Sequence, residues 1–155
     1  MHYREIVKDM NNAGEISGGI RSLAAAASAF SLSNIYMGNN EGGGLFCLAA
    51  FSLGIASLVA DEEKKFGNTM IPKDLFLQKL SGEMLKNSSR AGMYGALGSL
   101  TAWQSAMVMA DGDLIKGLAG LMAAISCSAL YFRHKQDSLE TEKTLSRTLS
   151  DMKRE

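Results

Sequence analysis

Residues that commonly carry chemistry are scarce in this chain of 155 residues, which has two histidines, two cysteines and one proline. Cys47 and Cys127 both lie in apolar stretches, where a free cysteine packs as a small hydrophobe. His134 lies in a basic flank, and Gly42–Gly44 lacks the Lys-Ser/Thr of a phosphate-binding loop. No group of residues has the spacing of a catalytic or metal site. We therefore expect no enzymatic activity, no catalytic residue, no cofactor and no metal.

Net charge is absent as well, because 16 basic residues balance 16 acidic ones. This balance gives no reason to expect a nucleic-acid partner, and no motif predicts a small-molecule substrate. What the sequence does have is an uneven distribution of charge, in which four apolar stretches alternate with charged segments. The stretches are Ser22–Met37, Gly44–Ala60, Ala91–Ala110 and Leu114–Phe132.

These stretches predict an all-α fold, a four-helix transmembrane bundle made of two helical hairpins. A membrane-spanning helix needs about 20 mostly apolar residues, with about 17 as the lower limit, and Ala91–Ala110 meets this length. The stretches are apolar on nearly all sides, whereas a helix of a water-soluble bundle has a single apolar stripe. Many of their residues are only alanine, glycine or serine, so an alanine-rich soluble helical bundle is the alternative.

Basic residues are distributed unequally between the two ends of the predicted bundle. The outer connections Gly38–Gly43 and Asp111–Asp113 contain none, while the termini and the central segment contain many. An excess of Lys and Arg near helix ends marks the cytoplasmic side of a membrane. We therefore predict cytoplasmic termini and location in a bacterial inner (plasma) membrane, with a host membrane after secretion as the alternative.

The two hairpins share a layout, which suggests an internal repeat within the single domain 1–155. An offset of 74 residues superimposes Gly18 on Gly92 and aligns the glycine-containing acidic turns. We predict that residues 17–60 and 91–134 form the two repeat units.

The polar segments are predicted to form short cytoplasmic amphipathic helices. A linker helix is expected at 72–90 with Pro72 in its first turn, and a C-terminal helix at 137–155. A further short helix is expected before the first apolar stretch. Apolar residues at helical spacing mark one face of the linker helix, which we interpret as a surface that lies on the membrane or docks a partner. This face contains Phe76, Leu77, Leu80 and Met84.

Small residues recur at a spacing of four in the third and fourth apolar stretches, a pattern that allows close approach of membrane helices. A glutamine amide in the third stretch is expected to seek a partner on a neighbouring helix. We predict that these residues serve helix packing or contacts between copies: Gly92, Gly95, Ala96, Ser99, Gln104, Gly120, Ala124 and Ser128.

The pattern as a whole favours a small polytopic membrane protein that acts as a non-enzymatic interaction or assembly component. Its expected partners are the lipid bilayer and either itself or another membrane protein. Two other functions fit the same pattern. One is a secreted effector that inserts into a host membrane, and the other is a holin-like pore-forming protein.

Overall fold

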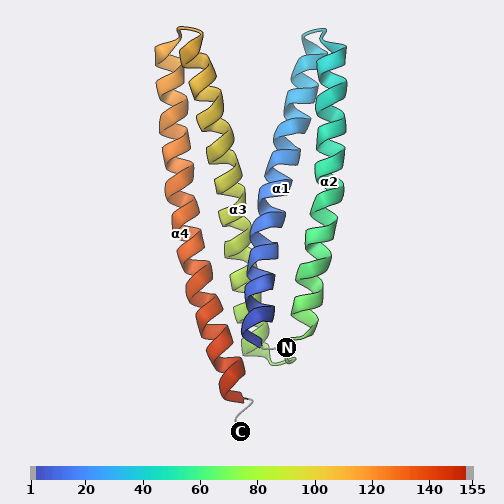
Figure 1. Ribbon diagram of the computed structural model, residues 1–155, viewed down its shortest axis with the longest axis vertical. Coiled ribbons are helices and arrows are strands. Elements are labelled where there is room, and N and C mark those ends of the chain that lie inside the picture. Colours follow the sequence, from blue (N-terminus) through green and yellow to red (C-terminus); the bar gives the residue numbers. More distant parts are fainter. Residues whose placement is uncertain (1–2, 153–155) are drawn as a thin grey trace.

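The computed structural model describes residues 3–152, apart from the side chains of residues 63 and 66, and these residues form four long α-helices. The helices are α1 (Tyr3–Tyr36), α2 (Asn40–Thr69), α3 (Leu75–Ala110) and α4 (Leu114–Met152). Figure 1 shows two antiparallel hairpins, α1–α2 and α3–α4, that meet near the chain termini and diverge toward their outer turns. The predicted all-α, four-helix architecture is confirmed.

Each helix extends well beyond the apolar stretch it contains. The prediction of separate short helices was wrong, because residues 75–90 are the first part of α3 and residues 137–152 are the last part of α4. The N-terminal polar segment is likewise part of α1. No proline separates these segments, and a glycine such as Gly92 costs a helix only about 1 kcal/mol. Residues 153–155 of the predicted C-terminal helix lie outside the described part of the chain.

The two outer turns are built alike. Gly38 follows α1 with φ +81° and Gly112 follows α3 with φ +92°, a backbone conformation that glycine adopts without a steric penalty. Asn39 and Asp113 then cap the next helix. Their side-chain oxygens accept hydrogen bonds of 3.0 and 3.2 Å from the backbone N–H three residues further on.

Asp74 fixes the start of α3. Its carboxylate accepts hydrogen bonds from the backbone N–H of Phe76 (2.9 Å) and Leu77 (3.1 Å). Pro72 was expected in the first turn of this helix, but it lies in the connection between α2 and α3. A carboxylate cap positions the helix start more directly than the proline does, because it satisfies N–H groups that have no partner within the helix.

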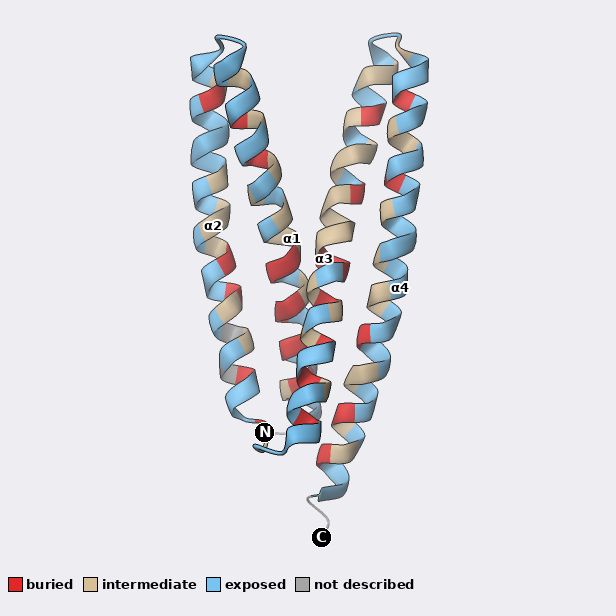
Figure 2. Ribbon diagram, turned by 180° about the vertical axis from the view of Figure 1, so that it is seen from behind, coloured by how far each residue is buried: buried red, intermediate tan, exposed pale blue. Residues whose placement is uncertain are grey.

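The buried core lies where the hairpins meet, in a region that we call the base (residues 3–21, 61–90 and 133–152). Figure 2 shows many of the buried residues gathered there, while most of the ribbon toward the outer turns is exposed or intermediate. The core side chains are Val7, Met10, Ile71, Leu77, Met84, Leu145 and Leu149. Both hairpins contribute to this cluster. Full burial of one such side chain stabilises a fold by about 1.5–3 kcal/mol, so the cluster holds the two hairpins together.

This core corrects the prediction of a docking face on the linker segment. Leu77 and Met84 are fully buried, so they are not available to a membrane or a partner, and the half-buried Leu80 packs against the same cluster. Phe76 alone remains largely free, with 57% of its surface exposed. The spacing identified a genuine apolar face, but other helices of the same chain cover it.

Candidate functional site: two apolar arms and a polar belt

Two arms, which we define as residues 22–60 and 91–132, hold most of the large apolar side chains that the chain exposes. Their charged residues are confined to the outer turns and the first turns of α2 and α4. Apolar side chains of the arms that are more than half exposed include Leu32, Leu45, Leu48, Phe51, Leu58, Val59, Trp103, Leu114, Ile115, Leu118, Met122, Ile125 and Phe132. Soluble monomers rarely expose a contiguous apolar patch of more than a few hundred Å², so the exposed apolar side chains of the arms are the feature that a function has to explain.

Two of the four helices, α2 and α4, are apolar enough to cross a membrane by length and composition. A buried core helix of a soluble protein can pass the same test. Here, however, only 17% of the apolar window of α2 and 11% of that of α4 is buried within the chain. Within the described residues, α1 and α3 are not apolar enough to pass this test of membrane crossing. Their arms are rich in Ala, Gly and Ser, which contribute little hydrophobicity.

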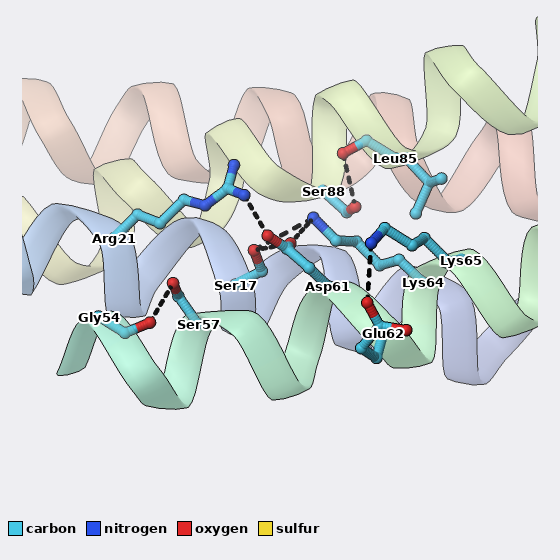
Figure 3. A network of polar contacts seen from close by, with 10 residues as sticks. All are labelled: Ser17, Arg21, Gly54, Ser57, Asp61, Glu62, Lys64, Lys65, Leu85 and Ser88. Carbon is cyan, nitrogen blue, oxygen red and sulfur yellow. Dashed lines mark hydrogen bonds and ion pairs between the residues drawn. The ribbon is translucent and has the colours of Figure 1, made fainter. Parts of the chain in front are cut away.

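A belt of polar side chains lies where the arms meet the base, and its first part joins α1 to α2. The Asp61 carboxylate accepts a hydrogen bond of 2.8 Å from the Ser17 hydroxyl and forms ion pairs with Arg21 and Lys64, as Figure 3 shows. Burial opposes ionisation of Asp61, but the hydrogen bonds from Lys64 and Ser17 and the nearby positive charges outweigh it. The pKa of Asp61 is therefore lowered.

The second part of the belt joins α1 to α4. The Glu15 carboxylate pairs with the Lys135 ammonium and accepts a hydrogen bond of 3.2 Å from the Tyr131 hydroxyl. Asp61 directly follows the apolar stretch of α2, and Lys135 lies at the corresponding level of α4, 74 residues later. The belt thus marks the level at which the uncharged parts of both hairpins end.

Replacing Asp61 with asparagine is expected to lower the free energy of unfolding by about 1–3 kcal/mol, because the change leaves the partly buried Lys64 ammonium, whose side chain is 17% exposed, without its carboxylate. In the parent protein this contribution is complete above the ordinary pKa of 3.8 and is lost as the pH falls through the lowered pKa of the folded state. Thermal unfolding in detergent, followed by circular dichroism from neutral pH to below pH 3.8, measures both effects.

Glu62→Gln is the matched control for Asp61→Asn. Glu62 pairs with Lys65 on the same helix, but the two side chains are 73% and 71% exposed, and such exposed pairs contribute at most about 1 kcal/mol. Equal losses in the two variants would show that the belt has no stabilising role of its own.

The closest approach of the two hairpins is a backbone contact between α1 and α3. A Cβ atom added to Gly18 would lie 1.9 Å from the Ser89 carbonyl oxygen, and one added to Gly92 would lie 1.8 Å from the Glu15 carbonyl oxygen. Both glycines are buried. Neither position has room for any side chain, so the crossing of α1 and α3 depends on glycine at both.

This crossing is reciprocal. Ser89 and Gly92 stand 74 residues after Glu15 and Gly18, so each hairpin contributes the same two positions to the contact. The same offset relates the hydrogen bonds of the two outer turns, in which the backbone N–H of Gly38 and of Gly112 each donates to the carbonyl three residues earlier at 3.0 Å. The predicted repeat of 17–60 and 91–134 stays a prediction, and it now has a geometric counterpart.

The structure separates the predicted packing residues of α3 between two neighbours. Gly92 lies against α1, and the Ala96 Cβ is 4.0 Å from a Cβ added to Gly19 of that helix. Gly95 faces α4, since a Cβ added there would lie 3.2 Å from the Tyr131 ring. Two further predicted residues lie away from these contacts: Ser99 is exposed and bonds its own helix, and Gln104 is half-buried with no hydrogen-bond partner among the described residues.

On α4, the predicted small residues lie along the contact with α3. Ala124 is buried, and a Cβ added to Gly120 would lie 2.1 Å from the Ser105 hydroxyl oxygen. Ser128 is exposed, and its hydroxyl donates to the Ala124 carbonyl at 2.9 Å. These positions therefore pack within the second hairpin. Contact with another copy is not needed to explain Gly120 and Ala124.

Sequence reasoning missed the α1 side of the crossing and the belt. Gly14, whose added Cβ would lie 2.1 Å from the Ser88 hydroxyl oxygen, and Gly18 recur at a spacing of four in α1, which is the signal used for α3 and α4. The pairing of Asp61 with Arg21 had no such signal, because the two residues are 40 positions apart.

The described residues contain no group of three or more His, Cys, Asp or Glu side chains that could hold a metal ion. The chain matches no protein-family model, no curated protein and no solved structure. A functional assignment therefore has to rest on the arms, the belt and the base.

Proposed function

We propose that this chain is a membrane protein that acts as a non-enzymatic interaction or assembly component, with both arms inserted in the bilayer and the base in the cytoplasm. The observation that carries the proposal is the exposed apolar surface of the arms, which has no charged residue between the first turns of α2 and α4 and the polar belt. The arm of α3, Ala91–Ala110, contains 20 residues. At 1.5 Å per residue it is about 30 Å long, which equals the thickness of the hydrocarbon core of a bilayer.

The composition of the inner helices supports the assembly part of the proposal. Figure 1 shows α1 and α3 between α2 and α4. The arms of α1 and α3 are less apolar than α2 and α4, and the α3 arm carries the half-buried amide of Gln104, which has no hydrogen-bond partner among the described residues. Polar side chains in hydrocarbon seek partners on neighbouring helices. A second copy or another membrane protein in contact with α3 would supply a partner for Gln104.

Cysteine accessibility tests the membrane topology. In a chain carrying Cys47→Ser and Cys127→Ser, a cysteine at Asn40 or Asp111 should react with an impermeant thiol reagent from outside intact cells, because the base-poor turns are expected there. A cysteine at Gly82 in the base should react only after lysis. All three positions are exposed, so burial does not limit the reaction.

Reaction of the cysteine at position 82 in intact cells would contradict the proposed orientation and favour the reverse one. Extraction of the protein by alkaline carbonate would overturn insertion and favour the soluble helical bundle. Recovery of the protein from the medium or from host membranes would favour the secreted effector, and dye leakage from vesicles holding the purified protein would favour the pore.

A further inference from the structure

One amide side chain lies well inside the second arm without a partner. Gln104 belongs to the uncharged stretch Ala91–Ala110 of α3, six residues before its outer end, which places it about 9 Å from that end at 1.5 Å per residue. It is half-buried and forms no hydrogen bond with any described residue. The arm of α1 also carries an amide, Asn34, but that amide donates to the Phe30 carbonyl at 2.9 Å and accepts from Asn39 at 3.0 Å. Within the described chain, Gln104 is thus left unsatisfied where Asn34 is not.

Contacts with α4 mark one side of α3. Gly98 lies against Cys127, and Ser105 lies against Gly120, at 3.2 and 2.1 Å from the Cβ atom that would be added to the glycine. Residues separated by three and four positions, as these are, form the seam between two packed helices. The α3 residues along the contact with α4 are Gly95, Gly98, Ala102, Ser105 and Met109.

A second series with the same spacing begins two residues later in α3, and we call it the second seam. An offset of two residues turns about 200° around a helix of 3.6 residues per turn, so the second seam lies on the side of α3 away from α4. It also lies beyond the crossing with α1 at Gly92, where the two arms diverge (Figure 1). Its members are half-buried or exposed, and they are Leu97, Leu100, Gln104 and Met107.

The first arm has no counterpart of the second seam. Phe30 stands 74 residues before Gln104, and its ring packs against Phe46 with the ring centroids 5.6 Å apart. The positions that correspond to Leu100 and Met107 hold a small alanine and a serine. The predicted repeat therefore does not account for the amide, which is particular to α3.

We infer that the second seam packs against the same seam of a second copy, so that the two Gln104 amides hydrogen-bond to each other across a two-fold axis. The inference rests on the proposed membrane function. Copies that share one orientation in a membrane, related by a two-fold axis along its normal, bring identical residues together at the same depth. A carboxamide has both donors and an acceptor, so two of them satisfy each other without any further polar group.

A different membrane protein would need a polar side chain of its own at the depth of Gln104, whereas a second copy brings one there by symmetry. One polar residue within an apolar seam also fixes the register and the number of the packed helices. The second seam has this composition, because its other members are leucine and methionine.

Disulfide cross-linking in the membranes of expressing cells tests the position of the contact. In a chain carrying Cys47→Ser and Cys127→Ser, Met107→Cys should form a disulfide-linked dimer on oxidation, whereas Ala106→Cys should not. Both positions are exposed, but position 106 is turned about 100° around the helix from position 107. Co-expressed copies with two different tags identify the partner, since a second copy puts both tags in one cross-linked product.

Replacement of the amide tests its role. Energy transfer between donor-labelled and acceptor-labelled chains in detergent measures the dissociation constant of the dimer. Gln104→Leu should raise this constant about tenfold, and Gln104→Asn, which keeps a carboxamide, should raise it less. Ser126→Leu is the matched control and should leave it unchanged. It also replaces an exposed polar side chain of an arm with leucine, but the Ser126 hydroxyl already donates to the Met122 carbonyl at 2.9 Å.

Equal cross-linking at positions 106 and 107, or a Gln104→Leu dimer as tight as that of the parent, would overturn the paired amides. A cross-linked product of Met107→Cys that holds one tag and a different protein would overturn the second copy and favour another membrane protein. These results would leave the proposed function standing as long as the parent resists alkaline carbonate. Extraction of the parent by carbonate would overturn insertion, and the shared depth that aligns the two amides would be lost with it.

Discussion

Replacing Gly92 with alanine is expected to force the two hairpins apart at their crossing. The added Cβ atom would lie 1.8 Å from the Glu15 carbonyl oxygen and 2.8 Å from the Gly19 nitrogen. Both are backbone atoms, so rotation of a side chain cannot relieve the clash. Overpacking in a core costs about 1–3 kcal/mol and occasionally more, and here the effect should reach at least the upper end of that range. Thermal unfolding in detergent measures it.

Gly82→Ala is the matched control because it changes a glycine of the same helix by the same methyl group. No atom lies within 4 Å of a Cβ added to Gly82. Alanine is the better helix former by about 0.5–1 kcal/mol, so this variant should be more stable than the parent. The two substitutions are thus expected to act in opposite directions. Stabilisation by both would mean that α1 and α3 do not cross at Gly92.

Because the crossing is reciprocal, Gly18→Ala should have an effect close to that of Gly92→Ala. The added Cβ atom would lie 1.9 Å from the Ser89 carbonyl oxygen. A large difference between the two would show that the hairpins contribute unequally, and it would weaken the repeat that the offset of 74 residues suggests.

The helices and their turns could be predicted from the sequence because their signals are local. Apolar stretches separated by Gly38 and Gly112, each followed by a capping Asn or Asp, define the hairpins. The helix lengths could not be predicted in the same way. The change from charged to apolar composition at residue 90 predicts a helix boundary, although charge alone does not end a helix and no stop signal is present.

The prediction of a docking face in the base was wrong for a different physical reason. The spacing of Leu77 and Met84 predicts that an apolar surface covers this helical face, but it does not identify which surface. The residues that cover this face, such as Val7 and Leu145, lie far away in the sequence, on the apolar faces of other helices. The reciprocal contact of Gly18 and Gly92 is long-range in the same sense. Each helix showed its small residues, and only the three-dimensional arrangement paired them.

Arginine substitutions in the middle of the arms are expected to abolish stable membrane insertion. Phe51 and Met122 lie near the centres of the apolar parts of α2 and α4 and are 68% and 71% exposed. An arginine at the centre of a spanning helix costs about 2.5–3.5 kcal/mol on the biological insertion scale, and the mild hydrophobicity of the neighbouring α1 and α3 offers little to offset it. The double variant Phe51→Arg/Met122→Arg should therefore be extracted by alkaline carbonate and be absent from the membrane fraction.

Leu75→Arg provides the control for that double variant, because Leu75 is 86% exposed but lies in the base. It should remain in the carbonate-resistant fraction, since the base is expected in water. The soluble bundle makes the opposite prediction for the arms. Exposed surface substitutions in water usually change stability by less than about 0.5 kcal/mol, and added arginines would only reduce an apolar patch. A parent protein that carbonate extracts, together with a double variant that stays folded and becomes more soluble, would place the arms in water and require a protein to cover them.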